Sequence, residues 1–414
     1  MAHAQALPYS QASVASGVRF DRLTNFALGL AVFMGGFVIF EPAPYELFLS
    51  ALLAIFFLLG LRISKDILPV LIPVVTFTIG GMISSFMVDD YMRGVIYNLV
   101  TLFLGLTTIL FALLIKQDMG RLRVIFRGYV LAAVATAMLG IIGYFEVPGF
   151  ETFTRYQRAQ GAFADPNVFA PFLIMPILYL IYGVMRRSFA LMPIRLGLLA
   201  ILLLGELLAG SRAGWGLALV TIVLFYTLLL INEPQARMRA KYVLFGVFGL
   251  VAVIIGIIGA LQIDAVWEIM VQRAKVVQDY DGARIGRFAR HAIGFELALT
   301  KPLGIGNLEF GFLYGEDEHN VYMRSLLSYG WLGFASWMTI ILWPMIAGFK
   351  SLFLVRPWQV YFQTAYVVFL GHLLVGWVID IDHWRHVWLI LGVMWGCILL
   401  EKHHQRSADR ETAQ

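Results

Sequence analysis

The stretch “YVLFGVFGLVAVIIGIIGALQ”, residues 242–262, contains no charged residue from end to end. An α-helix rises about 1.5 Å per residue, so about 20 apolar residues are needed to cross a hydrocarbon core of about 30 Å. Residues 242–262 meet this requirement. The stretch therefore predicts a transmembrane helix.

Apolar segments of similar length occur along the whole sequence. Of the 414 residues, 60% are hydrophobic and 14% are charged, whereas about a quarter are charged in soluble domains. We expect an all-α, polytopic membrane protein with about 12 transmembrane helices in one membrane domain, residues 1–414. The expected spans lie near residues 24–40, 46–61, 67–87, 95–115, 124–145, 168–185, 192–210, 214–231, 242–262, 322–347, 359–379 and 386–401. The single cysteine, Cys397, excludes a disulfide framework and a cysteine-based metal site.

The charges of the connecting loops predict the orientation of these spans. “RISKD” (residues 62–66) and “EPQARMRAKY” (233–242) are basic, whereas “EPAPYE” (41–46), on the other side, is acidic. Cytoplasmic loops of membrane proteins are enriched in Lys and Arg. We therefore expect both termini in the cytoplasm and the long polar segments, residues 146–167 and 263–321, on the outer face.

Arginine is unexpectedly frequent on this outer face. The planar guanidinium group suits phosphate oxygens, so the pattern indicates an anionic ligand. The outer arginines and histidines are Arg155, Arg158, Arg212, Arg273, Arg284, Arg287, Arg290, Arg324, His291 and His319.

Two segments that contain these arginines allow either a functional or a structural interpretation. “GSRAGW”, residues 210–215, places Arg212 in a short outer connection, with Glu206 just inside the membrane. Arg212 either binds an anion or extends to the interface, with or without an ion pair to Glu206. “DGARIGRFARHAIGFELAL”, residues 281–299, predicts an amphipathic helix with Arg284 and Arg287 on one face. Such a helix either binds a specific ligand or rests on lipid headgroups.

Two further segments contain helix-start signals beside candidate functional residues. In “RAQGAFADPNVFAPFL”, residues 158–173, Asp165 and the proline after it predict a capped helix, with Arg158 just upstream. In “GEDEHNVYMRSLLSYGWLG”, residues 315–333, Asn320 is placed to cap the next helix, and three acidic residues crowd His319. One of those acids could orient the imidazole ring. The glycines of “PLGIGNLEFG”, residues 302–311, are expected to form turns rather than a nucleotide loop.

In this order, the motifs resemble the O-antigen ligase and O-antigen polymerase superfamily of bacterial envelope glycosyltransferases. The resemblance covers residues 155–345 approximately and rests on “RAQGAFADPNVFAPFL”, “GSRAGW”, “ARIGRFARHAIGFELALTKPLGIGNLEFG” and “DEHNVYMRSLLSYGWLGFA”. It implies a metal-independent enzyme without a cofactor in the bacterial inner membrane. Residues 263–321 would form a periplasmic loop that carries part of the active site.

The resemblance also implies roles for individual residues. His319 is implied to be the catalytic residue, and Glu318 and Asn320 are expected to support it. The residues implied to bind the diphosphate of the donor are Arg158, Arg212, Arg284 and Arg287, the last by its place on the helix rather than by a motif match. The implied partners are a polyprenyl-diphosphate-linked glycan donor, a glycan or lipid A–core acceptor and the lipid bilayer, with no nucleic acid.

The implied chemistry is consistent with these side chains. An acceptor hydroxyl attacks the anomeric carbon, and polyprenyl diphosphate leaves as an anion that fixed guanidinium groups stabilise. Neutral imidazole is a suitable base near pH 7. Single-step attack opposite the leaving group predicts inversion of configuration.

Three alternatives remain open at this point. A ligase would transfer the glycan to lipid A–core, whereas a polymerase would extend a lipid-linked chain. A transporter or flippase would also use outer arginines, but few ionisable residues lie deep in the expected spans. A metal-dependent transferase would use pairs of acidic residues as metal ligands. The structural alternative is that these acids are solvated at the outer interface. The acids concerned are Asp89, Asp90, Asp380 and Asp382.

Overall fold

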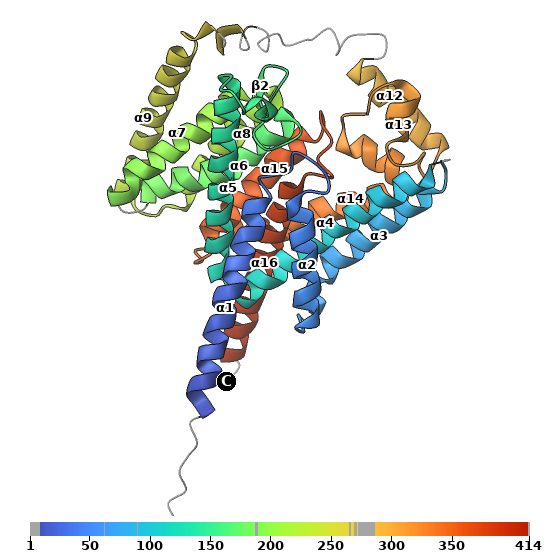
Figure 1. Cartoon of the computed structure of the whole chain (residues 1–414). Helices are drawn as coiled ribbons and strands as arrows, with labels where there is room; N and C mark the ends of the chain where they lie inside the picture. Colours follow the sequence, from blue (N-terminus) through green and yellow to red (C-terminus); the bar gives the residue numbers. More distant parts are fainter. Residues whose placement is uncertain are drawn as a thin grey trace, which may run out of the picture.

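The computed structural model describes residues 9–61, 63–88, 90–186, 189–264, 266–268, 271 and 286–412. The side chains of residues 9–20, 287, 288, 411 and 412 lie outside this description. The helices and strands, shown in Figure 1, are α1 (Tyr9–Met34), α2 (Pro44–Leu58), α3 (Leu68–Ser85), α4 (Tyr91–Gln117), α5 (Gly120–Tyr144), β1 (Thr154–Arg155), β2 (Arg158–Ala159), α6 (Pro166–Arg186), α7 (Met192–Leu208), α8 (Arg212–Asn232), α9 (Ala236–Ala260), α12 (Arg287–Thr300), α13 (Glu309–Tyr314), α14 (Val321–Gly348), α15 (Gln359–Val375) and α16 (Arg385–Thr412). Short 3-10 turns cover Lys65–Ile67, Glu151–Phe153, Phe189–Leu191 and Phe349–Phe353.

The protein is an all-α, multi-pass membrane protein. Among the described residues, eight helices are long and apolar enough to cross a membrane: α3 to α9 and α14. Two shorter apolar helices, α2 and α15, accompany them. Each of the twelve segments that the sequence predicts as spans overlaps one of the helices. Helices are favoured because hydrocarbon offers no hydrogen-bond partner to an unpaired backbone group.

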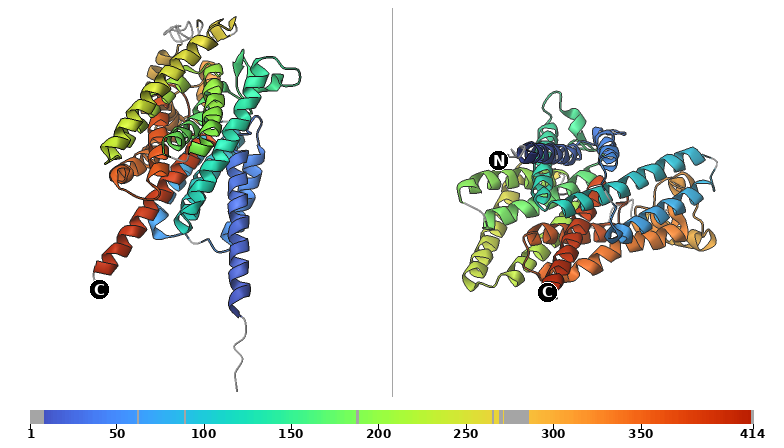
Figure 2. Two further views of the ribbon diagram at one scale, coloured as in Figure 1. Left: turned by 90° about the vertical axis from the view of Figure 1, so that its left-hand side faces the viewer. Right: turned by 90° about the horizontal axis from the view of Figure 1, so that it is seen from below.

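The bundle has two distinct ends, visible in Figures 1 and 2. The beginning of α1 and the end of α16 lie at one end, which we call the termini end. The antiparallel β1–β2 hairpin, α12 and α13 lie at the other, which we call the hairpin end. The interior is occupied by α4, α6, α15 and α16, whereas the apolar stretch of α9 is not buried at all.

The helix starts predicted from the sequence are confirmed. α6 begins at Pro166, and the Asp165 carboxylate accepts the N–H of Asn167 at 2.6 Å. At the start of α14, the Asn320 side chain accepts the N–H of Tyr322 at 3.0 Å and of the next residue at 3.1 Å. Each cap satisfies N–H groups that have no partner inside the helix.

The amphipathic helix predicted over residues 281–299 is described from Arg287 onward, as α12. Residues 281–285, which include Arg284, lie outside the described residues, as does the Arg287 side chain. α12 packs on α14, and Ala298 shares a small apolar cluster with Leu327. The described part of this helix is therefore fixed to the bundle.

The segment after α12 joins α14 at a break in that helix. Gly330 has φ 69° and ψ −175°, which interrupts the helical hydrogen bonds. The carbonyl of Leu327 accepts the N–H of Ile305 at 2.7 Å, and the N–H of Trp331 donates to the Pro302 carbonyl at 3.0 Å. The expected glycine turns are confirmed, because two glycines of this segment have positive φ. They are Gly304 and Gly306.

The crossing of α3 and α14 provides a test of this packing. A Cβ atom on Gly80 would lie 2.6 Å from the Tyr329 carbonyl oxygen and 2.9 Å from the Gly333 nitrogen, both backbone atoms. Gly80→Ala should therefore lower the free energy of unfolding by about 1–3 kcal/mol, the usual cost of overpacking. The measurement is the Tm of the purified protein in detergent.

Gly197→Ala is the matched control for this substitution. A Cβ atom there would meet nothing within 4 Å, and the position lies inside α7. Alanine has the higher helix propensity, so the Tm should stay equal or rise slightly. An unchanged Tm for Gly80→Ala would show that the close helix crossing is wrong.

Candidate functional site

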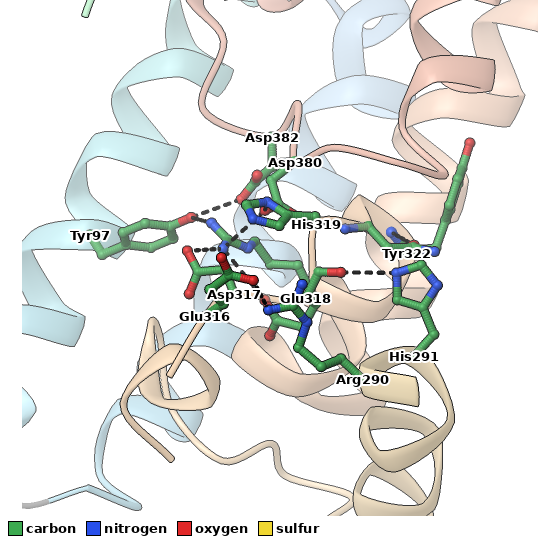
Figure 3. A network of polar contacts seen from close by, with 12 residues as sticks. Tyr97, Arg290, His291, Glu316, Asp317, Glu318, His319, Tyr322, Asp380 and Asp382 are labelled. Carbon is green, nitrogen blue, oxygen red and sulfur yellow. Dashed lines mark hydrogen bonds and ion pairs between the residues drawn. The ribbon is translucent and has the colours of Figure 1, made fainter. Parts of the chain in front are cut away.

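The buried guanidinium group of Arg324 organises the start of α14. Figure 3 shows the acidic residues Asp317, Glu318 and Asp380, which surround it. Nη2 of Arg324 lies 2.7 Å from Oδ2 of Asp317 and 3.1 Å from Oδ2 of Asp380. Oε2 of Glu318 follows at 3.4 Å. The Arg324 side chain is only 8% exposed, so these carboxylates compensate a charge that would be costly to bury alone.

These acids come from two loops that are remote in sequence. Asp317 and Glu318 precede α14, whereas Asp380 follows α15. Backbone hydrogen bonds join the loops, because the N–H of Val321 donates to the Gly376 carbonyl at 2.9 Å. The N–H of the residue before it, Asn320, donates to Oδ1 of Asp380 at 3.0 Å. The predicted cap residue therefore also fixes the second loop.

His319 lies at the surface of this junction. Its Nδ1 is 3.7 Å from Oδ2 of Asp380, and its side chain is 39% exposed. The ring thus faces a carboxylate and remains accessible. The carboxylate that faces the His319 ring is that of Asp380, and the expected supporting role of Glu318 stays a prediction. Glu316 instead pairs with Arg290 of α12.

The network continues toward the interior through residues that sequence reasoning did not assign to the site. Nη1 of Arg324 donates to the Tyr97 hydroxyl at 3.3 Å, which in turn donates to Oδ2 of Asp382 at 3.0 Å. Arg324 had been counted only among the outer arginines. The sequence signal for a role in this site is the position of Arg324 inside an apolar helix, because a charge there requires acidic partners.

Burial and charge shift the two acids nearest His319 in opposite directions. Burial raises the pKa of Glu318 to about 7, although Arg324 attracts the charged form. Burial would also raise the pKa of Asp380, but Arg324, His319 and the N–H of Asn320 together lower it below its ordinary value. Asp380 is therefore ionised at neutral pH, whereas Glu318 is partly protonated.

α12 supports the loop that carries His319. The Nε2–H of His291 donates to the Glu318 carbonyl at 2.9 Å, and the buried side chain of Arg290 pairs with Glu316. Both residues are adjacent on α12, which Figure 3 shows below the loop. The predicted basic helix thus contacts the candidate site through its described residues.

Two of the predicted arginines belong to the turn between α7 and α8, one by contact and one by position. The buried Arg158 donates from Nε to the Ala209 carbonyl at 2.6 Å and from Nη2 to Oδ1 of Asn167 at 2.8 Å. Arg212, half-buried, is the first residue of α8, and Ser211 caps this helix by accepting the N–H of Gly214 at 3.2 Å. Arg158 is therefore held against the turn that carries Arg212.

The ion pair considered between Arg212 and Glu206 is not formed. Glu206 is buried, and neither of its carboxylate oxygens has a hydrogen-bond partner among the described residues. The Glu206 carbonyl instead accepts the Nε1–H of Trp215 at 3.1 Å. A side chain at Gly214 would collide with the carboxylate, because its Cβ would lie 2.7 Å from Oε1.

The arginine turn and His319 lie at the same end of the bundle. α8 packs along α15, with Gly371 against Leu217. The start of α8 therefore lies beside the end of α15. The loop that follows α15 is bonded to Val321, just after His319.

The acids considered as metal ligands have protein partners. Asp90 caps α4 by accepting the N–H of Arg93, and Asp380 pairs with Arg324. In the part of the chain that the structure describes, which does not include Asp89, no three His, Cys, Asp or Glu side chains are arranged to hold a metal ion.

The raised pKa of Glu318 predicts a pH-dependent stability. Between its ordinary value of 4.5 and about 7, the folded state keeps a proton that the unfolded state has released. The stability contributed by this proton is complete below pH 4.5 and is lost as the pH rises through 7. Glu318→Gln removes this loss. The Tm of this variant minus the Tm of the native protein should therefore be larger at pH 8 than at pH 5.

The measurement is thermal unfolding in detergent at both pH values. Glu296→Gln, an exposed position on α12, controls for removal of one carboxylate. Its Tm relative to the native protein should be the same at pH 5 and pH 8. A pH-independent difference for Glu318→Gln would show that this carboxyl is not buried as described.

Comparison with known proteins adds no assignment. No protein-family model matches this chain, and no curated protein matches it. What is established is an all-α, multi-pass membrane protein whose two loops meet at Arg324, His319 and Asp380.

Proposed function

We propose that the chain is a polyprenyl-diphosphate-dependent glycosyltransferase of the O-antigen ligase type, which transfers a glycan to lipid A–core. The observation that carries the proposal is the accessible imidazole of His319 facing the Asp380 carboxylate. It lies at the same end of the bundle as the Arg158 and Arg212 turn. A polymerase that extends a lipid-linked glycan would use the same site with a different acceptor.

His319 acts as the general base in this proposal. The Asp380 carboxylate lies 3.7 Å from Nδ1 and favours the tautomer with its proton on that nitrogen, so that Nε2 is left to take the proton of the acceptor hydroxyl. The acceptor oxygen forms a bond to the anomeric carbon while the bond from that carbon to the phosphate oxygen breaks. The bonding electron pair leaves with polyprenyl diphosphate, and the configuration at the anomeric carbon inverts.

The arginines stabilise the leaving group in this proposal. Arg212 and Arg284 bind the diphosphate, and Arg158 and Arg287 contribute to the same binding. Fixed guanidinium groups can stabilise developing negative charge without a metal ion. Arg324 has a different task, because its guanidinium is already occupied by carboxylates and holds the His319 loop in place.

The proposed topology follows from the loop charges. All twelve predicted segments cross the bacterial inner membrane, and both termini lie in the cytoplasm. The hairpin end then faces the periplasm, and residues 263–321 form the periplasmic loop that contributes to the active site. The positions of the first and last helices at one common end are consistent with an even number of crossings.

Replacement of His319 by asparagine tests the base assignment. Asparagine suits the left-handed backbone at this position, where φ is 49°, but cannot accept a proton at neutral pH. Turnover should fall at least about 100-fold, within the usual contribution of a general base. Donor binding and Tm should stay close to those of the native protein. Near-native turnover would remove His319 from the mechanism.

Arg212→Lys tests the diphosphate assignment. Lysine keeps the charge but replaces a planar fork by a point charge, so donor affinity and turnover should both fall. Arg155→Lys, on the exposed hairpin, is the control and should behave like the native protein. Equal activity of Arg212→Lys and the native protein would exclude bidentate diphosphate binding at this position.

One assay distinguishes the possible activities. The purified protein is incubated with a prenyl-diphosphate oligosaccharide and either lipid A–core or a second lipid-linked glycan, in the presence of EDTA. Mass analysis of the products then identifies the acceptor. Transfer to lipid A–core supports a ligase, and chain extension supports a polymerase. Absence of transfer with either acceptor would contradict the proposed function, and turnover that stops in EDTA would contradict the metal-independent mechanism.

A further inference from the structure

A groove runs between α3 and α14, away from the candidate active site. The two helices approach each other closely where Gly80 meets the Tyr329 carbonyl and Gly333. Beyond this contact a groove of about 470 Å³ opens between them. Its lining includes Lys65, Thr76, Ala335, Ser336, Thr339 and Trp343. The volume is within the range of small-molecule sites, roughly 300–1,000 Å³.

The walls of this groove suit a hydrocarbon chain. Most lining side chains are apolar, and the hydroxyl groups already have partners. Thr76 and Ser336 hydrogen-bond to each other across the groove at 2.7 Å. Ser336 also donates to the Leu332 carbonyl at 2.8 Å, and Thr339 donates to the Ala335 carbonyl at 2.8 Å. A chain lying there would therefore leave these hydroxyl groups hydrogen-bonded.

The groove is cationic at one end. Lys65 is exposed and makes no ion pair among the described residues, whereas its neighbour Asp66 is occupied by Arg406 at 2.8 Å and by Lys116 at 3.4 Å. Arg406 lies near the end of α16, so Lys65 marks the termini end of the bundle. Trp343, which lines the groove, is a residue type that favours the boundary between hydrocarbon and water.

We propose that this groove binds one anionic phospholipid from the membrane leaflet at the termini end. An acyl chain lies between α3 and α14, and the phosphate group lies beside Lys65. The charge of Lys65 favours an anionic headgroup over a zwitterionic one. The glycolipid donor is not the occupant, because the groove opens at the end opposite to His319. This inference does not depend on the proposed transferase activity.

Native mass spectrometry of the purified full chain tests the proposal. The protein is titrated with phosphatidylglycerol or phosphatidylcholine that carry the same acyl chains. The native protein should retain one phosphatidylglycerol in preference to phosphatidylcholine. Lys65→Gln should lower this preference about fivefold, the effect expected for one basic residue near an anionic headgroup. Lys350→Gln, at an exposed lysine outside the groove, is the matched control and should keep the preference.

A second variant tests the hydrocarbon part of the groove. Ala335 is an exposed lining residue, so Ala335→Phe should fill the groove and remove the retained lipid of either class. Unchanged retention in this variant would overturn the site. An equal effect of Lys65→Gln and Lys350→Gln, or equal retention of both phospholipids by the native protein, would overturn the charge assignment. Displacement of phosphatidylglycerol by an equal amount of polyprenyl phosphate would overturn the choice of occupant.

Discussion

The burial of one positive charge determines how the hairpin end of this protein is built. A guanidinium group withdrawn from water requires anionic partners in direct contact, and removal of one partner is strongly destabilising. Arg324 obtains these partners from Asp317 and Glu318 in one loop and from Asp380 in another. Two segments that are about sixty residues apart in sequence are thereby held together. Their junction fixes the position of His319.

Hydrogen bonds of the backbone reinforce the same junction. Asn320 caps α14 through its side chain and binds Asp380 through its N–H, so one residue begins the helix and fixes the second loop. α12 contacts the first loop through Arg290 and His291. The imidazole of His319 is therefore exposed on a support that is itself rigidly bonded. In the proposed mechanism, this support would orient the base before the substrate arrives.

Local features of the sequence were sufficient for much of the fold. Long apolar runs predicted every helix that forms the bundle, because hydrocarbon permits few other conformations. The caps at Asp165 and Asn320 were recognisable because a helix start is determined by a few adjacent residues. The glycine turns after α12 were predicted for the same reason. The caps and turns depend on interactions within a few residues, and the spans depend on the composition of one continuous segment.

The partners within the candidate site could not be predicted in the same way. The apolar sequence around Arg324 is a signal that an acid must approach it, but several acids of the outer loops could fulfil that requirement. The choice of Asp380 depends on how α14 packs beside α15, which no local pattern determines. Arg158 was recognised as a candidate, yet its contact with the Ala209 carbonyl depends equally on tertiary packing.

The break in α14 has a consequence for how this end of the molecule opens. Around the break at Gly330, the carbonyl of Leu327 and the N–H of Trp331 form hydrogen bonds with the segment of residues 302–305, which precedes the helix. The amide proton of Ile305 is consequently protected by a hydrogen bond to α14, and that of Trp331 by a hydrogen bond to residue 302. Solvent can reach either proton only when both segments separate, so this loop and the middle of α14 form one cooperative unit in hydrogen exchange.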